Sequence, residues 1–208
     1  ELNGVDYIGL SSSELHGRNF DQETSRSAVG QPIGSFFVYE ADGLFQSDAE
    51  IQNYKNDRGE LLQPNAKPGD IRFKDLNGDG VINSDDRDFK GNPLPDCSMG
   101  LTLGFNYKNF DVSAFFQGVF GNEVYNLTNY LGEFYNQAQY NKNSTILDAW
   151  RPDNTDTDIP RVTLDDPNNN IRPSTYYIHN ASFVRLKNLK VGYTLPDKVA
   201  SKLKLKRT

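Results

Sequence analysis

The 208-residue chain has few of the residues that most often carry chemistry. It has one cysteine, Cys97, so no disulfide can form within the chain. Its two histidines, His16 and His179, lie in unrelated contexts, and no Ser-His-Asp order or zinc-ligand spacing stands out. No run of about 18 apolar residues is present, which argues against a transmembrane helix, whereas a transmembrane strand needs only about 9–11 residues. The sequence therefore predicts a protein that is not an enzyme.

Charge and composition narrow the class further. The net charge of -6 argues against general affinity for nucleic acid. Asparagine occurs 22 times, beside 17 glycines, 13 phenylalanines and 11 tyrosines. Asparagine and glycine favour turns, while phenylalanine and tyrosine favour strands. This bias predicts an all-β protein whose strands are joined by long polar loops.

The segment from Asp75 to Asp86 has the spacing of a twelve-residue calcium-binding loop. The predicted ligands are Asp75, Asn77 and Asp79 at positions 1, 3 and 5, the Val81 carbonyl at position 7, Asn83 at position 9 and Asp86 at position 12. Gly80, at position 6, permits the sharp turn, and Asp86 departs from the usual glutamate. The alternative is a tight turn that carries surface acids. We expect bound Ca²⁺.

The flanks of this loop indicate a structural ion and not a sensor. An EF-hand has a helix on each side of its loop. Here Pro68–Lys74, which precedes the loop, alternates as extended chain, and only a short helical turn is expected after Ser84. We therefore expect calcium to hold a long loop in one conformation.

Three segments alternate between apolar and polar residues as strands do. Residues 99–107 and 110–120 are joined by Lys108 and Asn109, which predicts a β-hairpin with a tight turn. Residues 181–195 alternate in two halves of opposite parity, so we expect a bulge near Lys187 and Asn188. A turn then follows Pro196, and residues 202–206 resume the alternation of a strand. Residues 34–39 are the best strand candidate in the first third of the chain.

The connections alternate between short and long, which is typical of outer-membrane barrels with short periplasmic turns and long extracellular loops. The predicted domains are an extracellular loop region over residues 1–98 that contains the calcium loop, a transmembrane hairpin over 99–120, a long extracellular loop over 121–180, and over 181–208 a transmembrane strand, a periplasmic turn and the start of the next strand. The fold class is thus part of a large transmembrane antiparallel β-barrel. A soluble β-sandwich also alternates along its strands, although its connections are more even.

Seven motifs, in order along the chain, resemble the SusC/RagA family of TonB-dependent outer-membrane transporters. They are Val29–Phe37, Asp42–Gln46, Pro68–Gly80, Gly91–Pro95, Phe116–Asn122, Trp150–Asn154 with Pro160 and Arg161, and Ala181–Leu189. Together they span most of the chain, and the resemblance is to the C-terminal part of such a transporter.

The resemblance implies far more protein than these residues could form. Such transporters are plugged barrels of about 22 strands. They work with a SusD-like surface lipoprotein and the TonB system to import glycans, oligosaccharides or peptides across the outer membrane of Bacteroidetes-type bacteria. The present chain would supply several strands and loops and would lack the plug, so we expect a fragment. The alternative is a soluble or surface-attached β module, stabilised by calcium, that binds glycans without transport.

Aromatic residues gather in the predicted long loop. They are Tyr125, Tyr130, Phe134, Tyr135, Tyr140 and Trp150. One interpretation is a surface that stacks on sugar rings or meets the lipoprotein. The other, which the size of the loop favours, is that these rings pack the loop onto its neighbours.

Overall fold

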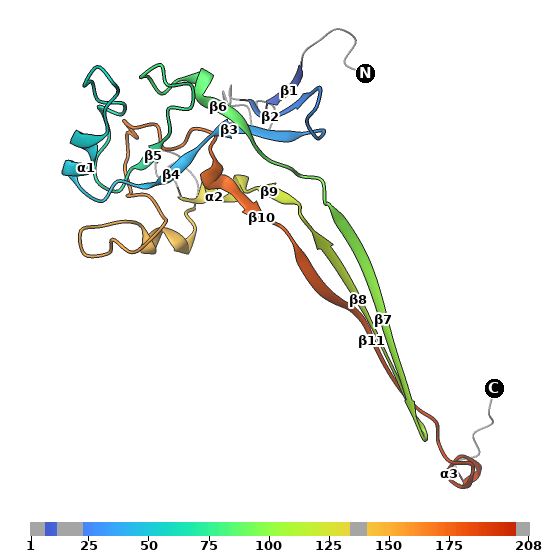
Figure 1. Cartoon of the computed structure of the whole chain (residues 1–208). Coiled ribbons are helices and arrows are strands. Elements are labelled where there is room, and N and C mark those ends of the chain that lie inside the picture. The colour runs from blue at the N-terminus through green and yellow to red at the C-terminus, as the bar shows by residue number, and fades with distance from the viewer. Residues whose placement is uncertain (1–6, 12–22, 134–140, 203–208) are drawn as a thin grey trace. The chain divides into compact units, whose positions relative to one another are not determined.

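The computed structural model describes residues 7–11, 23–133 and 141–202, and these ranges are built mainly from strands (Figure 1). The all-β class is confirmed. The chain divides into two compact units: unit 1 consists of residues 1–94 and 123–180, and unit 2 of residues 95–122 and 181–208. Unit 1 is therefore assembled from two stretches of sequence. Within the described ranges, no helix is both long and apolar enough to cross a membrane.

The described residues of unit 1 form three small antiparallel sheets. The first has the order β1-β2-β3-β6, with β1 at Tyr7–Ser11, β2 at Glu23–Ala28, β3 at Ser35–Tyr39 and β6 at Arg87–Gly91. The second pairs β4 (Ala41–Leu44) with β5 (Ile71–Phe73), and the third pairs β9 (Glu123–Tyr125) with β10 (Ile178–Asn180). Short helical elements lie between them: α1 (Asp48–Asn53), η1 (Ser84–Asp86), α2 (Leu127–Glu133), η3 (Ser144–Asp148) and η4 (Thr175–Tyr177). The strand expected over residues 34–39 is thus confirmed as β3.

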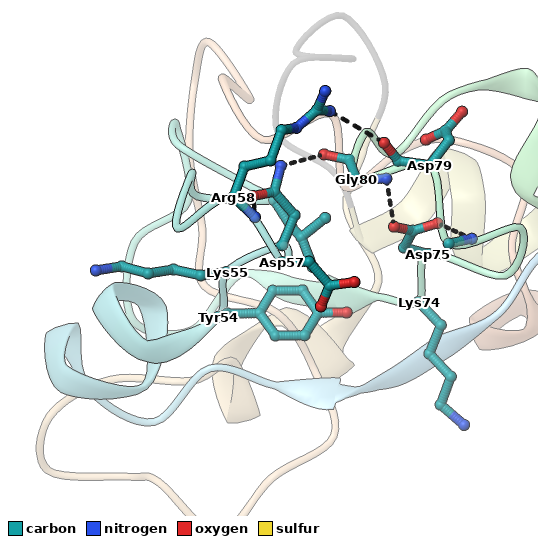
Figure 2. A pocket seen from close by; sticks show the side chains of 11 residues that line it. Tyr54, Lys55, Asp57, Arg58, Lys74, Asp75, Asp79 and Gly80 are labelled. Carbon is teal, nitrogen blue, oxygen red and sulfur yellow. Dashed lines mark hydrogen bonds between the residues drawn. The ribbon is translucent and has the colours of Figure 1, made fainter.

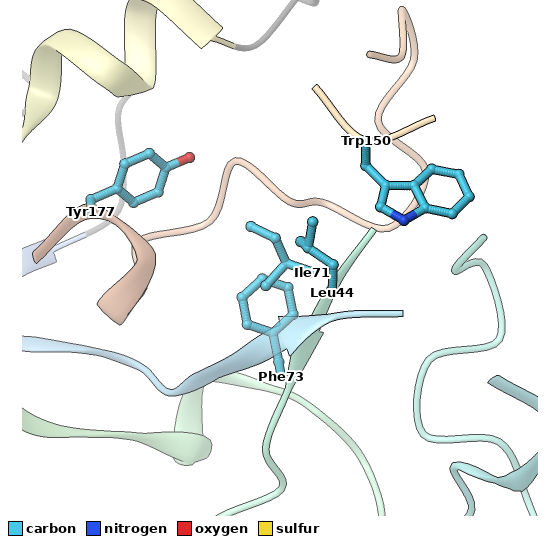
Figure 3. Close-up of a cluster of buried hydrophobic side chains, with 5 residues drawn as sticks. All are labelled: Leu44, Ile71, Phe73, Trp150 and Tyr177. Atoms are coloured by element: carbon cyan, nitrogen blue, oxygen red, sulfur yellow. The ribbon is translucent and has the colours of Figure 1, made fainter. Parts of the chain in front are cut away.

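The main apolar core of unit 1 joins its two stretches of sequence. Leu44, Ile71 and Phe73 come from β4 and β5, whereas Trp150 and Tyr177 come from the second stretch. Figure 3 shows these five side chains gathered above the paired strands. Residues 121–180, expected as one long loop, therefore contain elements of their own and contribute large aromatic side chains to this core.

A buried polar network lies beside this core. Asp70 is fully buried, and its carboxylate accepts hydrogen bonds from Arg161 Nε at 2.7 Å, Arg161 Nη2 at 3.2 Å and Asn170 Nδ2 at 3.0 Å. The backbone N–H of Lys67 donates to the same carboxylate at 2.8 Å. A buried charge is tolerated only when it is paired and hydrogen-bonded, and Asp70 meets both conditions. This network links Asp70 to residues 91 and 100 positions later in the chain.

The described part of unit 2 contains a sheet of three long antiparallel strands, with β8 between β11 and β7. Each strand has 11 residues: β7 is Cys97–Tyr107, β8 is Phe110–Phe120 and β11 is Phe183–Tyr193. Lys108 and Asn109 form the expected turn of the β7–β8 hairpin, with Lys108 at a positive φ of 54°. The hairpin predicted from the alternation is therefore present, and its first strand begins two residues earlier than expected.

A bulge keeps one face of this sheet apolar along its full length. The pairing of β11 with β8 shifts register between Leu186 and Asn188, at the place where the sequence predicts a bulge. Because directly paired residues share a face, the pairing defines five successive apolar rows. They are Tyr107, Phe110 and Tyr193; Phe105, Val112 and Val191; Leu103, Ala114 and Leu189; Leu101, Phe116 and Leu186; and Met99, Gly118 and Val184.

After β11 the structure differs from the sequence expectation. Residues Asp197–Lys202 form a short helix, α3, so Lys202 does not begin a strand as predicted. Pro196 precedes this helix, Asp197 lies in its first turn and Lys202 in its last turn, which is the charge order that the helix dipole favours. Residues 203–206, the rest of the predicted strand, lie outside the described residues.

We predict that replacing Asp70 with asparagine lowers the free energy of unfolding of unit 1 by about 3 kcal/mol, because Arg161 loses its buried counter-ion. Trp150 is the only tryptophan and is buried in the adjoining core, so its fluorescence during a urea titration reports the transition. Asp42→Asn is the control: Asp42 pairs with Arg72 at a partly exposed site, and its loss should cost about 1 kcal/mol or less. Equal effects of the two substitutions would contradict the stabilising role of the network.

Candidate metal centre

The predicted calcium loop connects β5 to η1 and β6 in unit 1. Gly78 and Gly80 have positive φ angles of 73° and 88°, which let the backbone turn sharply within six residues of Asp75. Ser84–Asp86, at the end of the loop, forms the short helical turn that the sequence predicts there. The backbone thus has the compact course that a single-loop ion site requires.

Two other predicted ligand residues, Asn77 and Asn83, contact the Asp79 carboxylate. Asn77 Nδ2 donates to Asp79 Oδ2 at 3.1 Å, and Asn83 Nδ2 donates to the same oxygen at 3.2 Å. Asn83 Nδ2 also lies 3.3 Å from the Val81 carbonyl oxygen, to which it donates. Positions 3 and 9 therefore meet at the carboxylate of position 5, and the Val81 carbonyl at position 7 contacts position 9.

The Asp79 carboxylate is stabilised in its charged form. The backbone N–H of Val81 donates to Asp79 Oδ1 at 2.8 Å. This hydrogen bond, followed by the one from the Asn77 amide, lowers the pKa of Asp79 below its usual value. Asp79 is thus an anion at neutral pH, as a ligand of a hard cation has to be.

The two remaining carboxylates, at positions 1 and 12, fix the backbone of the loop. Asp75 accepts hydrogen bonds from the N–H groups of Gly78 at 2.7 Å and Gly80 at 2.8 Å (Figure 2). Asp86 is fully buried and accepts from Leu76 N at 2.8 Å and Asn83 N at 2.7 Å, which ties the start of the loop to its end. A carboxylate has about four acceptor sites, so these bonds leave capacity for an ion.

The donors suit calcium better than a softer metal. They are carboxylate, amide and backbone carbonyl oxygens, which hard cations prefer, and no thiolate or imidazole is among them. Within the described residues, no group of three or more His, Cys, Asp or Glu side chains is placed to hold a metal. Any ion bound here would therefore depend on the amide and carbonyl oxygens of Asn77, Val81 and Asn83 as well as on carboxylates.

A groove of about 470 Å³ lies beside the loop. Its walls are residues 54–58 with Leu62 on one side, and Lys74, Asp75 and Gly78–Gly80 of the loop on the other (Figure 2). Asn56 Nδ2 donates to the Gly80 carbonyl oxygen at 3.1 Å, and Arg58 Nη2 donates to that of Asp79 at 3.2 Å. The sequence does not predict this contact, although Asn56-Asp-Arg-Gly59 is a turn signal.

Two of the aromatic residues in segment 121–180 pack inside unit 1. Trp150 is buried, and its Nε1 donates to Gln46 Oε1 at 2.9 Å. The Tyr125 ring lies with its centroid 5.5 Å from that of Tyr177. These contacts support the packing interpretation for both residues. The Tyr130 side chain and the residues Phe134, Tyr135 and Tyr140 lie outside the part that the structure describes.

Comparisons with known proteins identify relatives of the whole chain. No family model matches it. It is 35% identical over 196 residues to a TonB-dependent receptor of Formosa agariphila, an alignment that covers 94% of this chain and 19% of the receptor. It is 30% identical over 191 residues to the TonB-dependent receptor SusC of Bacteroides thetaiotaomicron, covering 92% of this chain and 16% of SusC. The solved RagAB peptide transporter superimposes with a TM-score of 0.61 and 25% identity, over 94% of this chain and 19% of that one.

The chain thus spans about a fifth of the length of the proteins that it matches. These proteins are TonB-dependent receptors and a peptide transporter. The likeness to the RagAB transporter covers nearly all of the present chain and supports the prediction that it is an all-β part of a barrel protein.

Replacing Asp86 with asparagine should loosen the loop even without a metal. In the variant, the new amide N–H group would face a backbone N–H group that now donates a hydrogen bond to the Asp86 carboxylate. A buried N–H group left without an acceptor destabilises the fold by about 1–3 kcal/mol. We expect faster amide hydrogen exchange over residues 75–86 in the presence of a chelator. The matched control is Asp85→Asn, because Asp85 is exposed. Similar exchange in both variants would show that Asp86 does not close the loop.

Proposed function

Because this chain belongs to the SusC/RagA family of TonB-dependent receptors, we propose that it forms part of the wall and the surface loops of an outer-membrane nutrient importer. The observation that carries this proposal is the sheet of unit 2. Its three strands each have 11 residues, and a transmembrane strand needs about 9–11. One face of the sheet is apolar in five successive rows, as a lipid-facing surface has to be.

The opposite face suits an aqueous interior. Its paired residues include Asn106 with Asp111 and Gly104 with Ser113, and Lys190 pairs with Ser113 from the other side. Alternation of apolar and polar side chains across a strand is the pattern of a barrel wall between lipid and a polar lumen. We assign the apolar face to outer-membrane lipid and the polar face to the lumen.

The strand connections support an orientation. Lys108 and Asn109 join β7 to β8 at one end, while the longer connections begin at the other end, where Cys97 pairs with Phe120. Outer-membrane barrels have short turns on the periplasmic side and long loops outside. We therefore propose that unit 1, including the calcium loop, belongs to the extracellular part of the receptor.

The relatives suggest the cargo and the partners. One solved neighbour is a peptide transporter, and one curated relative is SusC. We propose that the complete receptor imports oligosaccharides or peptides together with a SusD-like surface lipoprotein, driven by the TonB system through segments other than this chain. The cell would be a Gram-negative bacterium of the Bacteroidetes type. Within this mechanism the chain contributes shape and a stable surface, and none of its residues takes part in bond chemistry.

The alternative, a soluble calcium-stabilised β module, fits the sheet less well. A β-sandwich covers the inner face of each sheet with a second sheet. Here every residue of β7 is exposed, including Phe105 and Tyr107, which are 65% and 57% exposed. An apolar surface of this extent in a soluble monomer would favour aggregation. Lipid in contact with this face would cover the apolar side chains and so prevent such aggregation.

The calcium loop is the second part of the proposal. We propose that Asp75, Asn77, Asp79, Val81, Asn83 and Asp86 hold one structural Ca²⁺, with Asn83 acting through a water molecule. The contacts of the Asn77 and Asn83 side chains with Asp79, and the fact that each of these residues carries an oxygen donor, support this set. The ion would supply charge neutralisation for three carboxylates and hold the loop in one conformation. It would take no part in transport.

The wall assignment predicts opposite outcomes on the two faces of β11. Leu189→Arg, in the middle apolar row, should destabilise the folded receptor by about 2–4 kcal/mol, because the charge would face the centre of the bilayer. Asn188→Arg, on the opposite face, should be tolerated. Heat-modifiable migration of the full-length receptor from outer-membrane fractions measures both effects. The lipid assignment is wrong if Leu189→Arg assembles as well as Asn188→Arg.

The ion assignment predicts that the double variant Asp75→Ala, Asp79→Ala loses bound calcium, because two of the three carboxylates are removed. We expect residues 70–92 to become more mobile while β7 and β8 stay paired. Metal analysis after dialysis measures the ion. The control is Asp57→Ala with Asp85→Ala, which removes two exposed acids outside the predicted ligand set. Unchanged calcium in the first variant would falsify the assignment.

A further inference from the structure

Residues 54–62 form a small hairpin, here called the Asn56 hairpin, that packs against the calcium loop. Leu62 N donates to Tyr54 O at 3.1 Å, and Asn56 N donates to Glu60 O at 2.9 Å. The turn is closed by Gly59 N, which donates to Asn56 O at 2.9 Å. The Asn56 hairpin is thus a hydrogen-bonded unit with its base at Tyr54 and its tip near Arg58.

The Asn56 hairpin is attached on both sides of the first half of the calcium loop. At its base, the Tyr54 hydroxyl donates to the Phe73 carbonyl oxygen at 2.6 Å, two residues before the loop begins. Near its tip, Asn56 and Arg58 donate to the carbonyl oxygens of Gly80 and Asp79. The hairpin therefore spans the distance between the start of the loop and its positions 5 and 6.

Asn56 transmits this contact because its side chain is fixed at both ends. Its Oδ1 accepts from Arg58 N at 3.0 Å and from Glu60 N at 2.9 Å, and these bonds hold it within the hairpin. Its Nδ2 donates to Gly80 O at 3.1 Å and to Glu60 Oε2 at 3.0 Å. A side chain held by four hydrogen bonds has little freedom to follow Gly80 independently of its own hairpin.

The contact at Gly80 is also tight. A Cβ atom on Gly80 would lie 2.7 Å from Asn56 Nδ2, closer than real Cβ contacts come. Gly80 has a φ of 88°, so a larger residue would be strained there as well. The backbone at position 6 of the loop thus lies directly against Asn56, and a shift of one has to move the other.

We propose that calcium in the loop controls the order of the Asn56 hairpin and the width of the groove between them, through the contact of Asn56 with Gly80. This inference rests on the proposed calcium site. An ion bound by the Asp79 side chain fixes the backbone of Asp79 and Gly80, whose carbonyl oxygens hold the hairpin. When the ion leaves, the loop and the hairpin loosen together. The groove of about 470 Å³ is then a surface whose shape depends on calcium concentration.

The test is hydrogen exchange of the full chain with calcium and with a chelator. In the unmodified chain, we expect calcium to slow exchange over both 75–86 and 54–62, by at least about five-fold, the lower end of ordinary coupling between sites. The diagnostic variant is Asn56→Asp combined with Glu60→Gln. It keeps the acceptor for Arg58 N and Glu60 N, removes the donor to Gly80 O, and avoids repulsion between two carboxylates. Asn65→Ala, an exposed asparagine, is the control.

Each outcome decides a different claim. Coupling predicts that the diagnostic variant keeps calcium protection over 75–86 and loses it over 54–62, while Asn65→Ala behaves like the unmodified chain. Calcium protection over 54–62 that survives in the diagnostic variant overturns the role of Asn56. Protection over 75–86 alone in the unmodified chain overturns the coupling and leaves the calcium site intact. No effect of calcium on either segment overturns the calcium site and the coupling with it.

Discussion

The hydrogen-bonded ion pair between the Asp70 carboxylate and Arg161 is the interaction on which unit 1 depends. The Asp70 carboxylate is fully buried, and its partners Arg161 and Asn170 belong to the second stretch of the chain. Removal of a carboxylate from water is costly, and only the guanidinium and the N–H donors around it offset that cost. The charge can therefore be buried only when both stretches of unit 1 are in place. The polar network thus specifies how the two stretches pack together, which apolar contacts alone would specify less strictly. Trp150 packs with residues of strands β4 and β5 in the apolar core beside this network.

The sequence predicts those parts of the fold that depend on nearby residues. Alternation located β7, β8 and β11, and the change of parity near Lys187 located the bulge, because side-chain period is a local property of a strand. The network around Asp70 could not be predicted, since Arg161 and Asn170 follow Asp70 by 91 and 100 residues and each one alone resembles a surface residue. The helix α3 was missed because the lysine and leucine alternation that follows suggested a strand, whereas Pro196 and Asp197 favour a helical first turn.

In the candidate site, too, the sequence predicts the local features and does not predict the contacts between distant residues. Glycine and acid spacing defines the course of the loop, and the structure brings Asn77, Asp79 and Asn83 together around one carboxylate oxygen. The spacing does not reveal that Asp86 accepts hydrogen bonds from backbone N–H groups at both ends of the loop. Nor does it reveal Asn56, which lies some twenty residues earlier and contacts a backbone oxygen with no sequence signature of its own. Motifs specify ligands, whereas the tertiary fold determines what else touches them.

The separation between Asp70 and Arg161 also affects when the domain can fold. The ribosome adds about 5–20 residues per second. Some seconds therefore pass between the synthesis of Asp70 and that of Arg161, which lies 91 residues later. During that interval the first stretch lacks the Arg161 partner of Asp70 and the tryptophan of its core. The two-residue turn between β7 and β8 has no such delay. Unit 1 can therefore complete its buried network only after the second stretch has been synthesised, whereas the β7–β8 hairpin can form earlier.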